Sequence, residues 1–566
     1  MPVCPSSVRL AALAFWLVAG SLWAAPREAP PPRERPAQGL IVRMKADASP
    51  ADWDRVARAA GLQGRLSRER GARSRLLAAD ALLEAGAARE LAQRLREQPG
   101  VAWVEPNTRE RRLQAVTPND PDFTSGRQWW LRPVFGSNNS ALADRLRGVP
   151  GFQAAWVQSR GASDAVVAVL DTGYTDHPEL AGRVINGFDF VAEVDYANDG
   201  DGRDADAHDP GDWVSAEDRS AKPALFKDCT AEDSVWHGTI VAGQMVALTD
   251  NAVDVAAAQW QGRVLAVRVA GKCGATVADI VDGMRWAAGL PVAGAPVNPT
   301  PARVITLSFG GDAACGPAYQ DAIDDLRAVG AVVVAAAGNE HAAVLRPANC
   351  TGAIGVGAVN RDGFKTTYAN FGKEIALTTV GGDPAGEGVW GPLLGDSGLL
   401  TISNRGLRGP GTPGRAYVFG TSFSVPLVAA AASLMLTVRP SLSAAQLIGG
   451  LQRSARPHVS SPVIKACSDA NPGRCICSTS TCGAGLLDVP EALRYAADPA
   501  GYTALTLSPA VIDNAEVRAA ADLGADRPAN AAPESADRGI SGGALGWPWL
   551  LALGAAVWLV RRAGRT

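Results

Sequence analysis

Short apolar runs alternate with longer amphipathic segments through the middle of the chain. Five runs rich in valine, isoleucine and alanine each predict a buried β-strand: AVVAVLDTG (165–173), GRVLAVRVAG (262–271), ARVITLSFGG (302–311), AVVVAAAGN (331–339) and AIGVGAVN (353–360). Segments such as 277–289 and 317–330 lie between these runs and predict helices. Strands without a polar face must be covered on both faces, so residues 116–497 predict an α/β domain with a mostly parallel sheet.

A smaller pattern of the same kind occupies residues 39–115. GLIVRMK and VAWVEP predict its outer strands, and ADWDRVARAA and ARELAQRLREQ predict two helices between them. The charged stretch NTRERRLQ (107–114) predicts an exposed joint that a protease could cut. The chain is therefore expected to carry a small α+β unit ahead of the large domain.

The first 25 residues have the pattern of a secretory signal peptide. Arg9 precedes LAALAFWLVAGSLWAA, an apolar run of 16 residues that ends in small residues, and the Pro-rich residues 26–38 predict a linker. The alternative is a permanent membrane anchor. It is disfavoured because the run is short for a bilayer span and a charged segment follows at once.

The C-terminal end has a different pattern. Residues 498–541 are rich in Ala, Pro, Asp and Glu and predict a flexible linker. Gly542–Val560 follows as 19 residues without a charge, and a helix of that length reaches about 28 Å, enough to cross a membrane. The alternative, a buried core helix, has no core to join behind such a linker. Residues 542–566 therefore predict a transmembrane segment with its arginines on the cytoplasmic side.

The composition argues against nucleic acid as a partner and favours an oxidising compartment outside the cytoplasm. The 566 residues carry a net charge of −3, so there is no basic surplus to hold nucleic acid. Eight cysteines remain when Cys4 is set aside with the signal, and an even number in an exported chain favours disulfides. Cysteines 467, 475, 477 and 482 lie close together in sequence, but they lack the CxxC spacing and the nearby histidine of a zinc site.

Two candidate catalytic residues stand where predicted elements begin or end. Asp171 ends the strand of VAVLDTG, and His237 begins the apolar helical stretch HGTIVAGQMVA. A carboxylate at a strand end is held by rigid backbone, and a histidine at a helix start can act as a base. Taken singly, each is explained equally well as a turn aspartate or a core histidine.

Two further candidates lie later in the chain. In FGTSFSVPLVAAAASLM (419–435), Pro426 must lie in the first helical turn, where its missing N–H is harmless. Ser422 is then at the helix start, where unpaired N–H groups stabilise a developing oxyanion. Asn339 ends another predicted strand and could donate to the same oxyanion. Their ordinary alternatives are an N-cap serine and a turn asparagine.

The chain order of these four residues and the sequence motifs around them resemble those of a known protein family. Asp171, His237 and Ser422 follow the chain order of the catalytic residues of subtilisin. The stretches VAVLDTG, HGTIVAG, LSFGG, AAAGNE and GTSFSVP resemble the motifs of the subtilisin-like serine proteases, the subtilases, over residues 116–497. The resemblance implies a three-layer domain in which Ser422 forms an acyl-enzyme, His237 transfers the proton, Asp171 orients His237 and Asn339 stabilises the oxyanion.

The resemblance implies further parts of the molecule. Residues 39–115 resemble the family's propeptide, a ferredoxin-like inhibitor that is removed by self-cleavage. Extended polypeptide substrates would pair with two edges, at Ser308, Phe309 and Gly310 and at Gly271 and Gly274. Disulfides are implied for Cys229 with Cys273 and for Cys315 with Cys350, while the pairing of Cys467, Cys475, Cys477 and Cys482 stays open. The C-terminal GGALG, span and arginines resemble the GlyGly-type sorting tails that a rhomboid-like protease is thought to cut.

A structural calcium ion is the one cofactor expected, and no organic cofactor is. Closely spaced carboxylates on a glycine-rich loop repel one another unless a hard cation neutralises them. The loop 198–213 places five there: Asp199, Asp201, Asp204, Asp206 and Asp209. Glu179 and Asn251 fall where the family has another calcium site. A solvated acidic loop is the alternative.

Together these features predict a secreted, monomeric serine endopeptidase made as a precursor, with its C-terminal anchor either temporary or permanent. Two other classes are weighed against it. A non-catalytic calcium-binding surface protein on the same fold is disfavoured because all four catalytic positions are filled. An esterase of the α/β-hydrolase class would need a G-x-S-x-G elbow and a late catalytic histidine, and only His458 follows Ser422.

Overall fold

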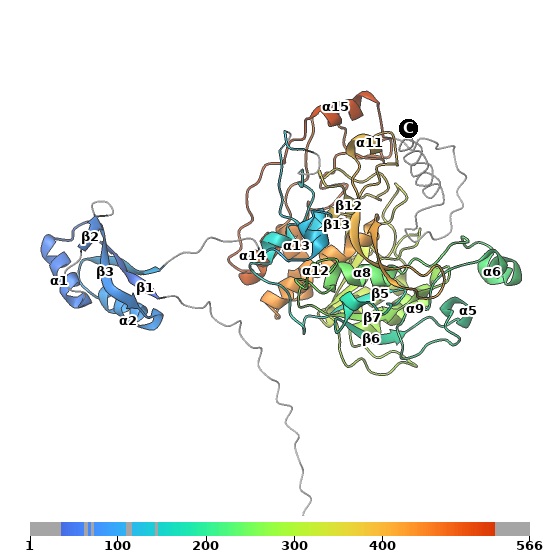
Figure 1. Cartoon of the computed structure of the whole chain (residues 1–566), viewed down its shortest axis with the longest axis horizontal. Helices are drawn as coiled ribbons and strands as arrows, with labels where there is room; N and C mark the ends of the chain where they lie inside the picture. The colour runs from blue at the N-terminus through green and yellow to red at the C-terminus, as the bar shows by residue number, and fades with distance from the viewer. Residues whose placement is uncertain are drawn as a thin grey trace, which may run out of the picture. The chain divides into compact units, whose positions relative to one another are not determined.

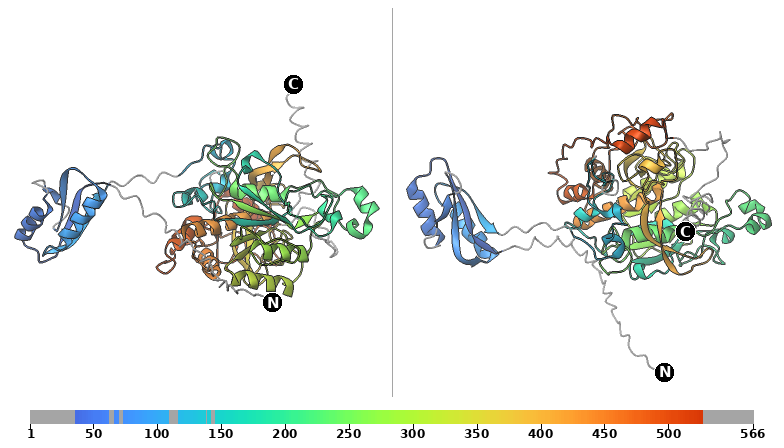
Figure 2. Two further views of the ribbon diagram at one scale, coloured as in Figure 1. Left: turned by 90° about the horizontal axis from the view of Figure 1, so that it is seen from below. Right: turned by 45° about the horizontal axis from the view of Figure 1, so that its top comes forward.

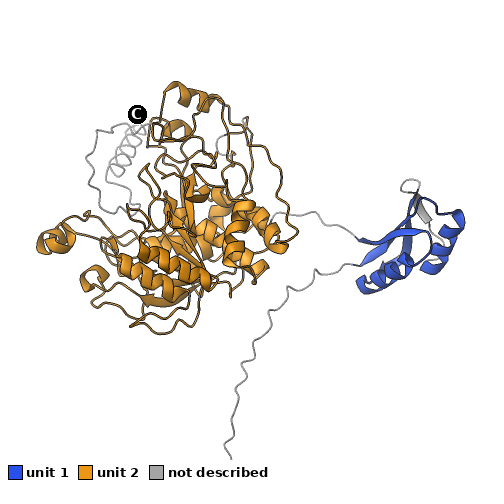
Figure 3. Cartoon of the chain, turned by 180° about the vertical axis from the view of Figure 1, so that it is seen from behind, with its two compact units in different colours: residues 1–113 blue, residues 114–566 orange. Residues whose placement is uncertain are grey.

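The computed structural model describes residues 36–61, 66–69, 73–108, 116–137, 139–141 and 145–526. Residues 1–25 of the expected signal peptide and 542–566 of the expected tail lie outside this part. The chain divides into two compact units, residues 1–113 and 114–566 (Figure 3). Each unit has its own hydrophobic core.

The first unit is a small α+β fold. Its elements are β1 (Ala37–Met44), α1 (Pro50–Ala60), β2 (Leu66–Glu69), β3 (Ser74–Leu83), α2 (Ala85–Arg96) and β4 (Val101–Thr108). The strands form an antiparallel sheet in the order β2-β3-β1-β4, which is the ferredoxin-like arrangement. Its core joins Leu40 and Val42 of β1 to Val56 of α1 and Leu91 and Leu95 of α2.

The second unit is built on a seven-stranded sheet in the order β13-β12-β11-β10-β5-β7-β6 (Figure 1). All six neighbouring pairs are parallel. The strands are β5 (Val167–Asp171), β6 (Val184–Asp189), β7 (Val264–Arg268), β10 (Val304–Leu307), β11 (Val332–Ala336), β12 (Ile354–Val359) and β13 (Ile375–Val380). The prediction of a mostly parallel α/β domain is confirmed.

Helices cover both faces of this sheet (Figures 1 and 2). On one face, Val167 and Val169 of β5 pack in the same core as α8 (His237–Val246) and α12 (Val425–Val438). On the other face, Ala168 and Leu170 pack with α9 (Val277–Ala287) and α10 (Pro317–Ala328). Alternate residues of one strand thus point into two cores, so the domain has three layers.

Shorter elements surround the layers. They are α3 (Pro121–Thr124), η1 (Trp129–Leu131), α4 (Phe152–Ala155), η3 (Pro178–Leu180), α5 (Val194–Ala197), α6 (Ala216–Ala221), α7 (Pro223–Phe226), β8 (Ala270–Gly271), β9 (Gly274–Ala275), α11 (Gly391–Leu394), β14 (Leu399–Asn404), β15 (Pro413–Val418), η4 (Thr421–Phe423), α13 (Ala444–Arg453), α14 (Val489–Ala497) and α15 (Ala515–Asp522). Among the described residues, one helical stretch, Thr421–Val438, is long and apolar enough to cross a membrane. It is 89% buried, as expected of a core helix.

Residues 498–526 differ from the flexible linker that their composition predicts. Ile512 and Val517 are fully buried in the same core as α12, and α15 packs against α11. Asp526 is 2% exposed and pairs with the fully buried Arg474 at 3.0 Å. The reason is that a few apolar residues and one ion pair, spaced among polar ones, are sufficient to dock an extended segment on an existing core.

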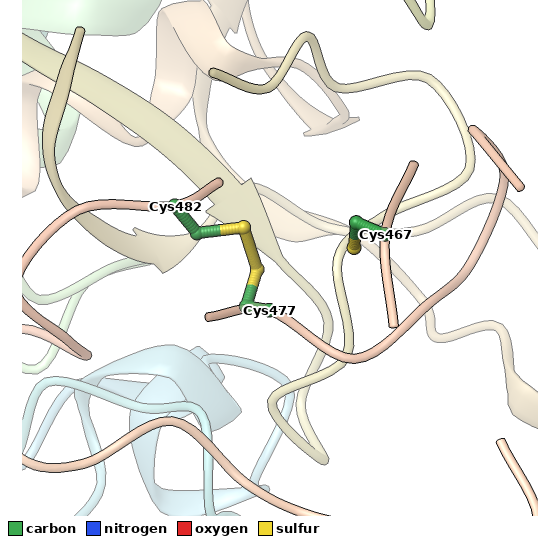
Figure 4. Close-up of side chains that lie close together, drawn as sticks. All are labelled: Cys467, Cys477 and Cys482. Atoms are coloured by element: carbon green, nitrogen blue, oxygen red, sulfur yellow. A yellow bond between two sulfur atoms is a disulfide. The ribbon is translucent and has the colours of Figure 1, made fainter. Parts of the chain in front are cut away.

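Four disulfides join the eight cysteines of the second unit. Cys229 is bonded to Cys273 and Cys315 to Cys350, the two pairs that the family resemblance implies. The four later cysteines pair locally, Cys467 with Cys475 and Cys477 with Cys482. The sulfur atoms of Cys467, Cys477 and Cys482 lie within 4.8 Å of one another (Figure 4). Because all three are disulfide-bonded, they have no thiolate to offer a metal ion.

Candidate active site

Asp171 and His237 form a buried, hydrogen-bonded pair. Asp171 is the last residue of β5 and His237 is the first residue of α8. The His237 Nδ1 lies 2.8 Å from Asp171 Oδ1 and 2.9 Å from Oδ2. A carboxylate only accepts, so Nδ1 carries the hydrogen and Nε2 is left to accept a proton. This is the arrangement of an oriented general base.

Glycine lets the helix start approach the aspartate so closely. A Cβ atom on Gly238 would lie 2.0 Å from the carbonyl oxygen of Gly173 and 3.1 Å from the Cβ of Asp171. Any other residue at position 238 would push α8 away from the turn after β5. The residue that precedes the helix, Trp236, has a left-handed backbone with φ of 58°. The Asp171–His237 distance therefore depends on the shape of this helix start.

The charge state of His237 depends on its acidic surroundings. Burial by itself lowers the pKa of His237, but the Asp171 carboxylate, by charge and by hydrogen bond, outweighs burial. Asp212 and Asp209 act in the same direction, and the pKa of His237 is raised above its usual value of 6.5. The imidazolium that forms when His237 accepts a proton is thus stabilised.

A second hydrogen-bonded connection ties the Asp171 turn to the start of α8. The Thr172 hydroxyl donates to Asp209 Oδ2 at 2.6 Å and accepts from the backbone N–H of Gly238 at 3.2 Å. Asp209 is only 2% exposed. It is one of the five loop aspartates expected to bind calcium, and the structure places it next to Thr172, beside the Asp171–His237 pair. The sequence offers no local signal for this contact, because Asp209 reaches Thr172 only through the fold.

Ser422 lies at the start of the helical segment that continues into α12. It belongs to η4, it is 3% exposed, and Pro426 occupies the first turn of α12. The Ser422 hydroxyl donates to the Ser308 carbonyl oxygen at 3.2 Å, and the Ser308 hydroxyl donates back to the Ser422 carbonyl at 3.0 Å. No hydrogen bond joins Ser422 to His237 in the described part of the chain. The neighbouring Phe423 ring lies 5.2 Å from the His237 ring, so both residues border one site.

Asn339 completes the same site. It follows β11, and its Oδ1 accepts from the backbone N–H of Thr421 at 2.9 Å and from the Thr421 hydroxyl at 3.0 Å. These two donors identify which end of the amide is the oxygen and leave the Nδ2 hydrogens available. An added Cβ on Gly420 would lie 3.7 Å from that Nδ2. The amide donor of Asn339 is therefore next to the residue that precedes the Thr421–Ser422 turn.

The two expected substrate edges border one small pocket. Ser308, Phe309 and Gly310 follow β10, and the Phe309 ring lies 5.8 Å from the His237 ring. Phe309 and Gly310 line the pocket together with Ala275 of β9 and Val277 of α9. Gly274 precedes Ala275, whereas Gly271 is buried, and a Cβ on it would lie 2.0 Å from the Tyr196 carbonyl. The structure thus brings the first edge and the β9 end of the second to the site.

The expected calcium ligands fall into two places. Asn251 Nδ2 donates to Glu179 Oε1 at 3.0 Å, while Glu179 Oε2 is buried without a hydrogen-bond partner. Four of the five loop aspartates accept hydrogen bonds from protein groups. Asp199 pairs with Arg268 at 2.6 Å, and Asp206 accepts from Asn186 at 3.0 Å. Over the residues that the structure describes, the five expected loop ligands do not bring three carboxylate oxygens within 4.8 Å of one another. The five are Asp199, Asp201, Asp204, Asp206 and Asp209.

This chain is similar in sequence to proteins named as extracellular proteases. An extracellular protease of Xanthomonas campestris pv. campestris is 35% identical over 424 residues, which are 74% of this chain and 64% of that protein. An extracellular basic protease of Dichelobacter nodosus is 31% identical over 385 residues, which are 68% of this chain and 58% of that protein. The matches therefore span less than two thirds of either relative.

A solved structure and a family model match as well. The structure of a protease from Pseudoalteromonas arctica PAMC 21717 has 35% sequence identity and a TM-score of 0.55, and the match covers 67% of this chain and all of that one. The model of the subtilase family, Peptidase S8, matches residues 162–479, which include Asp171, His237, Asn339 and Ser422. The chain belongs to the subtilase family of serine peptidases.

Proposed function

We propose that this chain is a secreted serine endopeptidase that hydrolyses polypeptides through an acyl-enzyme. The observation that carries the proposal is the buried Asp171–His237 hydrogen bond of 2.8 Å beside a serine at a helix start. The relatives named as extracellular proteases support both the activity and secretion.

In the first step, the Ser422 oxygen attacks the peptide carbonyl carbon while His237 Nε2 takes the hydroxyl proton. The negative charge that forms on the carbonyl oxygen is stabilised by Asn339 Nδ2 and by the backbone N–H of Ser422. Collapse of this intermediate breaks the C–N bond, and the His237 proton passes to the departing amine. Water then attacks the acyl-enzyme through the same steps and releases the carboxylic acid product and free Ser422. Asp171 holds the imidazole in the required tautomer throughout.

Substrate binding has to redirect the Ser422 hydroxyl. In the free protein this hydroxyl donates to the Ser308 carbonyl at 3.2 Å. Ser308 belongs to the edge that would pair with the substrate backbone, so an incoming peptide competes for that carbonyl. Rotation about the Ser422 side chain would then bring its hydroxyl towards His237, since catalytic hydrogen bonds often tighten only in the complex.

Casein hydrolysis by the purified protein tests the assignment. Ser422→Ala and His237→Ala are each expected to remove all but a residual rate, because the triad acts as a unit. Ser424→Ala is the matched control, since Ser424 is buried two residues away and donates to the Val380 carbonyl at 3.1 Å. Equal hydrolysis by Ser422→Ala and the parent would refute Ser422 as the nucleophile, whereas no hydrolysis by the parent itself would favour a non-catalytic surface protein.

The first unit is proposed as an inhibitor propeptide removed by self-cleavage. Its support is that it forms a separate compact unit, which ends close to the charged stretch 107–114. Ser422→Ala is expected to accumulate as a precursor that retains residues 39–115, as read by intact-mass measurement. Normal trimming of Ser422→Ala would show that another protease makes the cut.

A structural calcium ion is proposed at Glu179 and Asn251. The support is a buried Glu179 oxygen with no hydrogen-bond partner, in a region where Asp254 and Asp120 add negative charge. Oxygen ligands of this kind suit calcium. The acidic loop 198–213 is also proposed to bind calcium, although four of its five aspartates already have partners within the protein.

The C-terminal residues 542–566 are proposed to hold the precursor at a membrane with its catalytic unit outside. Removal by a rhomboid-like protease would release a soluble monomer. Cell fractionation checks this idea: deleting residues 542–566 should move the protein from the membrane fraction to the medium.

A further inference from the structure

The pocket between the two substrate edges has an apolar lining and one charged residue. Its volume is about 40 Å³, and it is lined by Ala275, Val277, Ile280, Phe309, Gly310, Gly311, Tyr319 and Arg346. A cavity of this volume has room for roughly two or three water molecules, which is about the volume of one carboxylate group. The size is therefore suited to the end of one side chain and not to a whole ligand.

The guanidinium of Arg346 has no charge partner. Its Nε is buried without a hydrogen bond, and its Cζ lies 5.9 Å from the Tyr319 ring centroid. Among the described residues, no carboxylate makes an ion pair with Arg346, and the nearby Asp312 is exposed. Arg346 as a whole is only partly buried, but its Nε has lost water without gaining an acceptor, which is costly. An incoming anion would recover that cost.

The backbone around Arg346 keeps its guanidinium at the pocket. The N–H of Gly311 donates to the Arg346 carbonyl at 3.0 Å, and the N–H of Arg346 donates to the Gly311 carbonyl at 3.2 Å. An added Cβ on Gly311 would lie 3.0 Å from the Arg346 Nε, so glycine leaves the space that the side chain uses. Gly311 directly follows the Ser308–Gly310 edge. Arg346 is thus fixed to the segment that would hold the substrate backbone.

We propose that this pocket makes the enzyme selective for substrates with an acidic side chain at one fixed position near the scissile bond. Glu or Asp enters between Phe309 and Tyr319, and its carboxylate accepts hydrogen bonds from Arg346. The inference rests on the proposed peptidase function and names its substrate class. Arg346 is then a specificity-determining residue that takes no part in bond cleavage.

Peptide cleavage measures the selectivity directly. Peptides cut from a mixed proteome first locate the position at which Glu and Asp are enriched. At that position, kcat/KM for a Glu peptide is expected to exceed that for its Gln counterpart by about 10- to 100-fold in the parent, the range of a charge-assisted bond. The ratio should fall to about 1 in Arg346→Gln, remain partly elevated in Arg346→Lys, and favour Lys over Gln in Arg346→Glu.

The design separates selectivity from stability and from activity. Both peptides meet the same enzyme, so their ratio does not depend on the fraction of a variant that folds. Arg494→Gln is the matched control, because Arg494 is 42% exposed and paired with Glu491 on α14; it should keep the parent ratio. Cleavage without acidic selectivity, or selectivity that persists in Arg346→Gln, overturns this inference alone. Failure to cleave any peptide overturns the proposed function together with it.

Discussion

Replacing Glu179 with glutamine measures what an unneutralised buried carboxylate costs this fold. Burial is the main cause that raises the pKa of Glu179, with Asp254 and Asp120 adding to it against the Asn251 hydrogen bond, from 4.5 to about 7. The side chain belongs to a residue that is 2% exposed, and its Oε2 has no hydrogen-bond partner. The proposed calcium ion would supply the counter-charge, so the effect should depend on both pH and calcium.

The sign of the pH effect follows from where the carboxyl ionises. Below pH 4.5 it is protonated in both the folded and the unfolded chain and contributes no pH dependence. Between pH 4.5 and 7 the unfolded chain loses the proton first, so the free energy of unfolding falls as pH rises. Above pH 7 the loss is complete, and the rise in the pKa of Glu179 from 4.5 to about 7 corresponds to about 3 kcal/mol.

Thermal unfolding in the Ser422→Ala background, which excludes self-digestion, is the assay. In chelator at pH 8.5, Glu179→Gln should be more stable than its parent by about 3 kcal/mol, and the two should be nearly equal at pH 4. With about 2.1 cal/mol/K of unfolding entropy per residue over a fold of about 400 residues, this is about 4 °C in Tm. Calcium should raise the Tm of the parent by more than that of Glu179→Gln, in which any rise would come from the acidic loop 198–213.

Two outcomes would refute this reasoning. A glutamine variant no more stable than the parent in chelator at pH 8.5 would show that the buried carboxylate is not costly. An equal gain at pH 4 and pH 8.5 would show that charge is not the cause. Glu217→Gln on α6 is the control, because Glu217 is exposed and its replacement should change stability by less than about 0.5 kcal/mol.

Three further predictions follow from particular contacts. Asp171 raises the pKa of His237, and the neutral imidazole is the base, so kcat/KM should fall as the pH drops through a value above 6.5. Asp171→Asn should lower kcat by about 10⁴-fold. A fall in kcat/KM centred on the usual histidine value of 6.5 would contradict the geometry. Asp209→Ala should lower kcat by about 10-fold, because the Thr172 hydroxyl loses its acceptor. Asp209→Asn keeps an acceptor oxygen and should restore most of the rate. If Asp209 has a purely structural role, the two variants should have the same kcat at a temperature where both are folded. Asp526→Ala should cost about 1 to 3 kcal/mol, because buried Arg474 loses one carboxylate partner and keeps Asp383. The exposed Asp522→Ala should change stability little, and equal Tm values for the two variants would show that residues 498–526 are not docked.

Much of the fold follows from periodicity. The runs of β5, β7, β10, β11 and β12 are apolar on both faces, and this pattern predicts all five strands correctly. Strand β6 was not predicted, because VINGFD is an edge strand with only its last two residues buried. Strand β13 was not predicted either, because the buried threonines 378 and 379 interrupt its apolar pattern. Both become strands through pairing with β7 and β12.

Some residues of the candidate site can be predicted from the sequence, and others cannot. Asp171, His237, Asn339 and Ser422 stand out in the sequence because short motifs place each at the end of a strand or the start of a helix. Thr172 and Asp209 do not stand out, since Asp209 lies in a polar loop, 37 residues further along the chain. Arg346 is equally inconspicuous in LRPANC, and only the pocket shows that it is unpaired. Residues that position the catalytic groups or select the substrate do so through contacts with distant segments of the chain, so short sequence motifs do not reveal them.

By itself, the sequence determines the alternation of strands and helices, the family motifs and the residues that can transfer a proton, because these depend on local spacing and side-chain chemistry. The tertiary structure decides which of many similar acids matters. Glu179, Asp209 and Asp526 look alike in sequence. In the fold, Glu179 has one buried oxygen without a hydrogen-bond partner, Asp209 accepts from Thr172 beside the Asp171–His237 pair, and Asp526 shares Arg474 with Asp383. The energy of a charge depends on its distance from water and from other charges, and those distances exist only once the chain is folded.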